Sequence, residues 1–168
     1  MKNIEIESRE NRLDSLFKRI EHAAEDPELQ SHWARYLCIL VSGFLETSIR
    51  TIFARYARER AHPKVAGFVT AQLGFLRNPK MGKILELVHA FSADWEEQLK
   101  AATEGEIQAA VNSIVTNRNH IAHGRNVSLG LVGLQGYYKS AKKLVRLLEE
   151  LCDGSVNKHR SRSQDRAG

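Results

Sequence analysis

Arg118 and His123 stand five positions apart at the end of a strongly helical stretch, and these two residue types together suit phosphodiester chemistry. Arginine holds a phosphate with a planar fork of N–H donors, and histidine transfers protons near neutral pH. Asn119 directly follows the arginine and can orient a substrate through its amide. RNA cleavage without a metal needs a base for the 2′-OH, an acid for the 5′-oxygen and positive charge on the transition state. Arg118, Asn119 and His123 are therefore the candidate catalytic residues.

Helical geometry constrains how these side chains can meet. Residues four apart share a helix face, so Asn119 and His123 should be neighbours. Arg118 leaves the helix about 140° away from His123. Either the long arginine side chain bridges that gap, or two copies of the helix meet and assemble each site across a symmetric interface. The same spacing also fits a capped, solvated helix end with no chemistry, so that interpretation stays open.

The elements that must position these residues are all expected to be helices. Leu, Ala, Glu, Lys and Arg are abundant, prolines number only three, and no segment alternates with period two. Apolar spacing predicts helices over residues 7–24, 27–61, 65–76, 80–91, 93–101, 103–123 and 129–152. The long second helix has a broad apolar face, which predicts contacts on more than one side. Gly43 within it predicts the close approach of another backbone, Thr103 and Glu106 form a capping-box pattern, and Gly124 is a natural C-terminal cap.

The length of 168 residues suits one compact unit, which we expect to be a single helical domain over residues 1–152. Residues 153–168 are rich in Ser, Lys and Arg and are expected to form a disordered basic tail, either a weak RNA-binding arm or a solubilising end. The net charge of +5 includes +3 from residues 155–168. The remaining +2 argues against a dedicated duplex-binding domain.

Several classes of protein are not expected from this composition. No apolar run reaches the roughly 20 residues that cross a bilayer, and the polar N-terminus lacks a secretory signal, so we expect a cytoplasmic protein with no membrane partner. Cys38 and Cys152 lie in apolar helical patterns and read as reduced core thiols, although a disulfide is the alternative. His120 and His123 lack an apparent third ligand, so neither a metal nor another cofactor is expected.

The chain resembles the HEPN superfamily, most closely its RiboL-PSP-HEPN type. The resemblance rests on Arg118–Gly124, with an asparagine directly after the arginine, near the end of the penultimate long helix. Supporting stretches are Gly43–Glu46, Phe75–Pro79, Lys83–Leu87, residues 91–95 and the Tyr137–Tyr138 pair, and the similarity covers roughly residues 29–151. It implies an all-α, HEPN-like helical bundle with a long second helix, several short helices and two long C-terminal helices.

This resemblance also implies a function. HEPN proteins of this type are homodimers whose motif helices face each other, and many are metal-independent endoribonucleases in toxin–antitoxin, antiviral defence or RNA-processing settings. Expected partners are then RNA, a second copy, and a cognate antitoxin or defence-system protein. Arg118, Asn119 and His123 would be catalytic. A binding or dimerisation module with the same fold but no turnover, which holds RNA or a protein, is the alternative.

Three further residues are candidate helpers of the motif. Glu46 can act as a polar helper from the second helix, or it can simply pair with Arg50 four residues on. His120 is expected at the surface or at a dimer edge. Arg125 stands where some HEPN toxins have a tyrosine that is modified, so that mode of regulation is not expected here. Arg125 either adds a phosphate contact or is merely exposed.

Overall fold

The chain folds as seven α-helices, and the part of it that the structure describes contains no β-strand. The computed structural model describes residues 3–23 and 25–164, with side chains for residues 3–22 and 25–154. The helices are α1 (Ile4–Ala23), α2 (Pro27–Arg60), α3 (Pro63–Leu73), α4 (Met81–Phe91), α5 (Ala93–Thr103), α6 (Glu106–Ala122) and α7 (Leu131–Gln164). The expected all-α bundle is confirmed, with its long second helix and its two long helices at the end.

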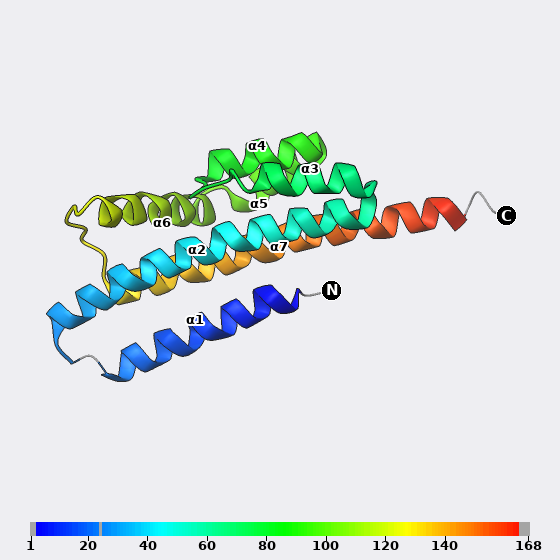
Figure 1. Ribbon diagram of the computed structural model, residues 1–168. Coiled ribbons are helices and arrows are strands. Elements are labelled where there is room, and N and C mark those ends of the chain that lie inside the picture. The colour runs from blue at the N-terminus through cyan, green and yellow to red at the C-terminus, as the bar shows by residue number, and fades with distance from the viewer. Residues whose placement is uncertain (1–2, 24, 165–168) are drawn as a thin grey trace.

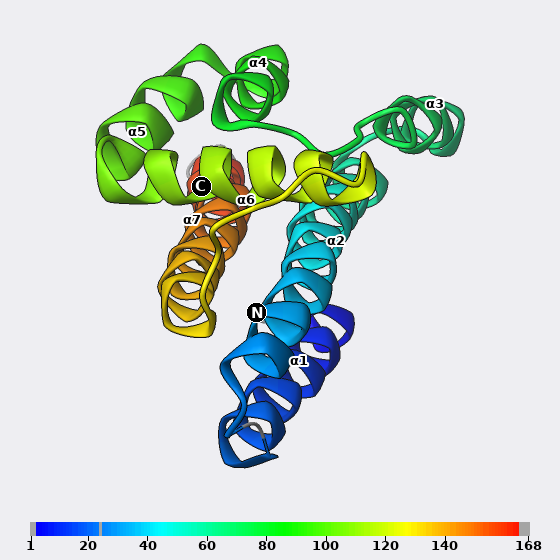
Figure 2. The same cartoon turned by 90° about the vertical axis from the view of Figure 1, so that its left-hand side faces the viewer.

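Two long helices, α2 and α7, run side by side in the same direction through the middle of the molecule (Figure 1). The Phe44 ring meets the Tyr138 ring, and further along Arg55 pairs with Asp153, which is the register of a parallel pair. Helix α1 packs on one side of this pair, and α3 to α6 lie on the other (Figures 1 and 2). The broad apolar face of α2 is thus covered from several sides, as its sequence predicted.

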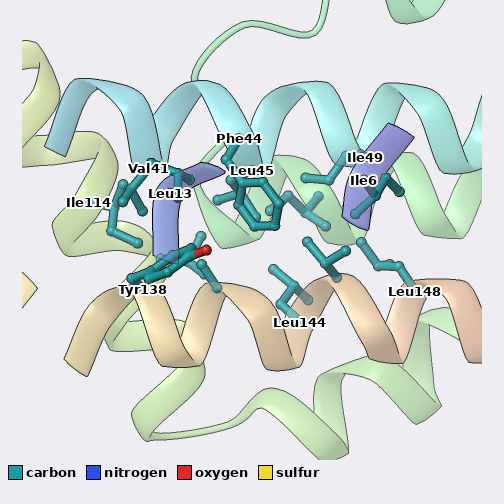
Figure 3. Packing of buried hydrophobic residues seen from close by; sticks show 14 of the residues in the cluster. Ile6, Leu13, Val41, Phe44, Leu45, Ile49, Ile114, Tyr138, Leu144 and Leu148 are labelled. Carbon is teal, nitrogen blue, oxygen red and sulfur yellow. The ribbon is translucent and has the colours of Figure 1, made fainter. Parts of the chain in front are cut away.

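Tyr138 joins three helices at the centre of the core, which Figure 3 shows from close by. Its ring stacks on Phe17 of α1 at 5.1 Å and meets Phe44 of α2 edge-on at 5.8 Å. The hydroxyl donates a hydrogen bond of 3.2 Å to the carbonyl oxygen of Glu10. Burial, with a smaller effect of the Asp14 charge, raises the pKa of Tyr138. The phenol therefore remains a neutral donor that ties α1 to the central pair.

The start of α6 differs from the predicted capping box. Thr103 is the last residue of α5, where it is buried and its hydroxyl donates to the Leu99 carbonyl oxygen at 2.8 Å. The N-cap of α6 is Gly105, whose φ of 86° suits glycine. The Glu106 carboxylate accepts a hydrogen bond from the Ser140 hydroxyl on α7 at 3.5 Å. The capping-box prediction was wrong because Thr103 ends α5 and bonds within it, while Glu106 bonds to α7.

Two further expectations differ from the structure. Gly43 is exposed, and a Cβ added there would meet nothing within 4 Å, so the predicted close approach of a backbone is wrong within this chain. Helix α7 continues to Gln164 and extends beyond the end of α2 (Figure 1), whereas a disordered tail was expected from residue 153. No proline interrupts residues 153–164, and their lysines and arginines favour helix. The rest of the expected tail, residues 165–168, lies outside the described residues.

Cys38 and Cys152 form no disulfide and both are buried, which confirms that they are core thiols. Cys38 lies where α6 crosses α2, with its sulfur 3.7 Å from the Ile114 carbonyl oxygen. By length and composition, α2 is the one described helix that could span a membrane, but 61% of its most apolar window is buried inside the bundle. A core helix of a soluble protein passes the same test, so this is weak evidence of a membrane span.

Alanine substitutions at two neighbouring residues of α2 should change the free energy of unfolding in opposite directions. Phe44 is 4% exposed, so Phe44→Ala should lower the free energy of unfolding by about 3–5 kcal/mol through the cavity it leaves. Gly43→Ala should raise it by about 1 kcal/mol, because alanine favours helix and its methyl group meets open space. Urea denaturation of both variants measures this. Destabilisation by Gly43→Ala would contradict the open surface.

Alkaline pH should weaken the fold through the two thiols. Burial raises the pKa of Cys38 to about 11 and that of Cys152 to about 12, from 9.0 for a free thiol. The raised pKa values mean that this stability is fully present below pH 9.0 and is lost as the pH rises towards 11–12. Within that pH window, each thiol should lower the free energy of unfolding by up to about 1.4 kcal/mol per pH unit. Denaturation under reducing conditions should show a smaller alkaline loss in a Cys38→Ala/Cys152→Ala variant; equal losses would contradict it.

Candidate active site at the end of α6

The rotation of α6 is set by an apolar stripe that crosses the central pair. Val111, Ile114 and Val115, at helical spacing, are all 2% exposed or less. Arg118 continues this stripe one turn further, where it is half-buried. The core thus decides the direction in which every motif side chain leaves the helix.

The end of α6 is closed by a Schellman motif. Gly124 has φ 68°, and its N–H donates to the Ile121 carbonyl oxygen at 3.1 Å. The N–H of Arg125 reaches back to the His120 carbonyl oxygen at 2.9 Å. These are the 5→2 and 6→1 bonds of this helix ending, which glycine favours because of its positive φ. The predicted glycine cap is confirmed, and it gives His123 a defined place at the C-cap.

The three motif side chains do not all meet within one chain. The Arg118 guanidinium lies 3.4 Å from the Asn119 amide oxygen. Within the described part of the chain, the exposed His123 imidazole makes no hydrogen bond or ion pair, and nothing joins it to Arg118. Their directions, about 140° apart on the helix, account for this separation. A single copy therefore presents two halves of a site on different sides of one helix end.

Asn119 and His123 share a ridge of α6 with Asn112. Positions 112, 119 and 123 fall within about 40° of one another around the helix axis. The helical bond from the His123 N–H to the Asn119 carbonyl oxygen, 3.1 Å long, keeps the last turn regular. The amide and the imidazole thus face the same way, as their spacing predicted, while Arg118 lies in line with the buried stripe.

The structure separates the two interpretations of Glu46. Its carboxylate pairs with the Arg50 guanidinium at 2.8 Å and accepts the backbone N–H of Asn78 at 2.5 Å. Arg50 also donates to the carbonyl oxygen of Leu76, through Nε at 3.0 Å and through Nη2. Pairing with Arg50 is thereby confirmed, and Glu46 holds the connection between α3 and α4. No described contact links its carboxylate to the motif.

The remaining helper candidates have mainly backbone roles at the helix end. His120 is half-buried and supplies the carbonyl that closes the Schellman motif, while Arg125 is exposed just past it. Neither side chain forms a hydrogen bond or ion pair with another described residue. Arg125 is thus free to contact an anion beside His123.

Three polar residues that the sequence did not single out fix the surroundings of the site. Asn78 has φ 42°, and its amide oxygen accepts the Ser42 hydroxyl at 3.3 Å. The Asn112 amide oxygen accepts the Met81 N–H at 2.9 Å and so fastens the start of α4 to α6. The Asn78-Pro79 pair is typical of an interruption between helices. The partners of these side chains lie 31 to 36 positions away, so no local sequence pattern predicts the contacts.

The motif lies in a part of the chain that lacks acidic residues. Residues 107–148 contain six Lys or Arg and no Asp or Glu, and residues 60–85 contain five Lys or Arg and again no acid. Three of these cations are paired: Lys142 and Arg146 with carboxylates of α1, and Lys83 with Glu86. The remaining cations give these two segments an excess of positive charge that the overall charge conceals. Such a field attracts a polyanion.

The donor set at this helix end suits anions and proton transfer. The described residues contain no group of three or more His, Cys, Asp or Glu able to hold a metal ion. A guanidinium, a primary amide and an imidazole can instead contact a phosphate, orient a hydroxyl and move a proton.

The glycine cap should be required for a stable helix end. Gly124→Ala forces a side chain into the left-handed region, so we expect the free energy of unfolding to fall by about 1–2 kcal/mol. Gly133→Ala, in the exposed first turn of α7, is the matched control and should not destabilise. Chemical denaturation with amide hydrogen exchange at residues 120–125 measures both. Unchanged exchange in Gly124→Ala would contradict a structural role for the cap.

Comparison with known proteins tests the HEPN resemblance. Residues 4–154 match the RiboL-PSP-HEPN family, a span that covers all seven helices at least in part. No curated protein and no solved structure matches the chain. Membership of a HEPN family indicates an RNase or RNA-related module. With its all-helical fold and its Arg-Asn-x3-His helix end, the chain belongs to the RiboL-PSP-HEPN family.

Proposed function

We propose that this protein is a metal-independent endoribonuclease whose active site is assembled from two copies of the chain. The observation that carries the proposal is the arrangement at the end of α6. Arg118 and His123 are held on a rigid, accessible helix end, yet they face different ways and make no contact within one chain. A second motif helix placed opposite the first would supply the missing half of each site.

A large apolar surface on α2 supports dimer formation. Leu29, Trp33, Tyr36 and Ile39 are each between 36% and 48% exposed on the first third of this helix. Cys38, in the same stretch, contacts α6 from the opposite, buried side of α2. Clustered exposed apolar side chains of this size are typical of protein interfaces. We propose that a second copy of the chain covers this surface.

The chemistry follows from the side chains present. One neutral imidazole takes the proton of a ribose 2′-OH, whose oxygen attacks the adjacent phosphorus. The bond from phosphorus to the 5′-oxygen breaks, and the imidazolium of the other copy donates its proton to the leaving oxygen. The Arg118 guanidinium stabilises the charge on the phosphorane-like transition state, and Asn119 orients the ribose or the phosphate. The products are a 2′,3′-cyclic phosphate and a free 5′-OH.

We expect unpaired RNA as the substrate, in loops or single strands. In an A-form duplex the bases lie in a deep, narrow groove, whereas an unstacked strand can bend its backbone into the site. A cytoplasmic toxin or defence effector, held in check by a cognate antitoxin or defence-system partner, is the setting that we propose. A free helix end without acidic neighbours suits an enzyme that takes many RNA sequences.

Purified wild-type protein should cut single-stranded RNA in EDTA and leave 2′,3′-cyclic phosphate ends. His123→Ala and Arg118→Ala should each reduce the cleavage rate by about 10²–10⁴-fold, since each removes proton transfer or transition-state charge. Both side chains are partly or fully exposed, so melting temperatures should change little. Gel assays of cleavage, end-group analysis and sedimentation of the native protein measure these effects.

His22→Ala and Arg19→Ala on α1 serve as matched controls, because both residues are exposed on the opposite side of the central pair. They should cleave like the wild type. Cleavage that disappears on chelation, or a protein that stays monomeric while it cleaves, would contradict the composite metal-independent site. RNA binding without any cleavage would favour the alternative of a non-catalytic HEPN module.

A further inference from the structure

The connection between α3 and α4 displays an aromatic ring to solvent. Phe75 is 78% exposed, more than any other described aromatic side chain. Its neighbours Leu73 and Leu76 are only 4% and 8% exposed, so the backbone on both sides of the ring is anchored in the core. Burial of this phenyl ring against the core would lower the free energy of the folded protein, and that gain is not realised here.

Side chains from two other helices fix this connection. Arg50 of α2 binds the Leu76 carbonyl oxygen, and Glu46 binds the Asn78 N–H, as described above. Ser42 adds the bond to the Asn78 amide, and Asn112 of α6 holds Met81. Polar anchors at three consecutive points leave the Phe75 segment little freedom to fold its ring inward. The exposure of the ring is thus built into the fold.

The anchor on α6 relates this connection to the motif. Asn112 stands on the same ridge as Asn119 and His123, about 10 Å and 16 Å along the helix axis from them. Figure 2 shows the connection from α3 to α4 passing beside α6. An extended ligand that runs from Asn119 and His123 along this ridge towards the start of α6 therefore reaches the α3–α4 connection at Asn112.

The charge of this connection is positive and unpaired. Arg77 and Lys80 are exposed and form no ion pair with any described residue. No acidic residue occurs in residues 60–85. Glu46, whose carboxylate binds the Asn78 N–H of this connection, is paired with Arg50. The surface beside Phe75 thus complements a phosphate backbone.

We propose that Phe75 and Arg77 bind the unpaired RNA strand that runs on from the cleavage site, with Phe75 stacked on a base and Arg77 on a phosphate. The inference rests on the proposed function, since RNA is the ligand at both places. Base stacking on an aromatic ring together with a nearby cation is a common way to hold single strands without sequence preference. The cation beside the ring distinguishes this surface from the exposed apolar surface of α2.

The test is binding of a short fluorescein-labelled oligoadenylate to the full-length protein carrying His123→Ala, which keeps the RNA intact. In this background Phe75→Ala should weaken binding by about 5- to 150-fold, and Phe75→Trp should restore it. Arg77→Ala should weaken binding and reduce the salt dependence of log Kd by about one phosphate contact. With 2-aminopurine in the strand, quenching on binding should need the ring at position 75. Ile4→Ala and Lys18→Ala on α1 are controls for lost apolar surface and lost charge.

The outcomes separate this inference from the proposed function. Unchanged RNA affinity in Phe75→Ala, while the native protein still cleaves RNA, overturns the inference and leaves the function standing. Weaker binding in Phe75→Ala, with no cleavage by the native protein, supports the RNA surface and removes the nuclease. Phe68, on the neighbouring helix α3, is the other strongly exposed phenylalanine. If Phe75→Ala and Phe68→Ala both shift the sedimentation from dimer to monomer, the Phe75 ring belongs to an interface between copies, and the inference is wrong. No binding by the His123→Ala parent also overturns it.

Discussion

The burial of the α6 stripe against the central helices is the constraint on which the site depends. Val111, Ile114 and Val115 can be covered only if α6 crosses the α2–α7 pair in one rotation. That rotation turns Asn119 and His123 to one side and leaves Arg118 in line with the buried stripe. The groups proposed for proton transfer and for phosphate binding thus lie on two surfaces of one helix. The hydrophobic core, rather than any contact among the motif residues, sets the geometry of the proposed chemistry.

The helix end combines rigidity with accessibility. A Schellman motif satisfies backbone carbonyls that would otherwise be free, so the last turn needs no side chain to hold it. The side chains of His123 and Arg125 therefore stay available to a ligand. No acidic residue occurs in residues 107–148, and neither side chain forms an ion pair with a described residue. Both features suit a site that receives a polyanion.

Glu46 and Arg50 form a polar anchor for the connection between α3 and α4. They fasten this connection to α2, while Asn112 fastens the same connection to α6. The connection is thus held against both helices that border the site.

The sequence by itself determined the helices and the motif at the end of one of them. The signals in the sequence act within one or two turns of a helix: periodic apolar residues, prolines at helix starts and the Gly124 cap. The structure confirms the seven helices and the Gly124 cap, with shifts at some helix ends. The tertiary structure decided where polar side chains found partners. Thr103 turned inward instead of capping α6, Gly43 met open space, and Asn112 bonded to Met81 across 31 positions. Such choices depend on which helices become neighbours, and the packing that makes them neighbours is a property of the whole core.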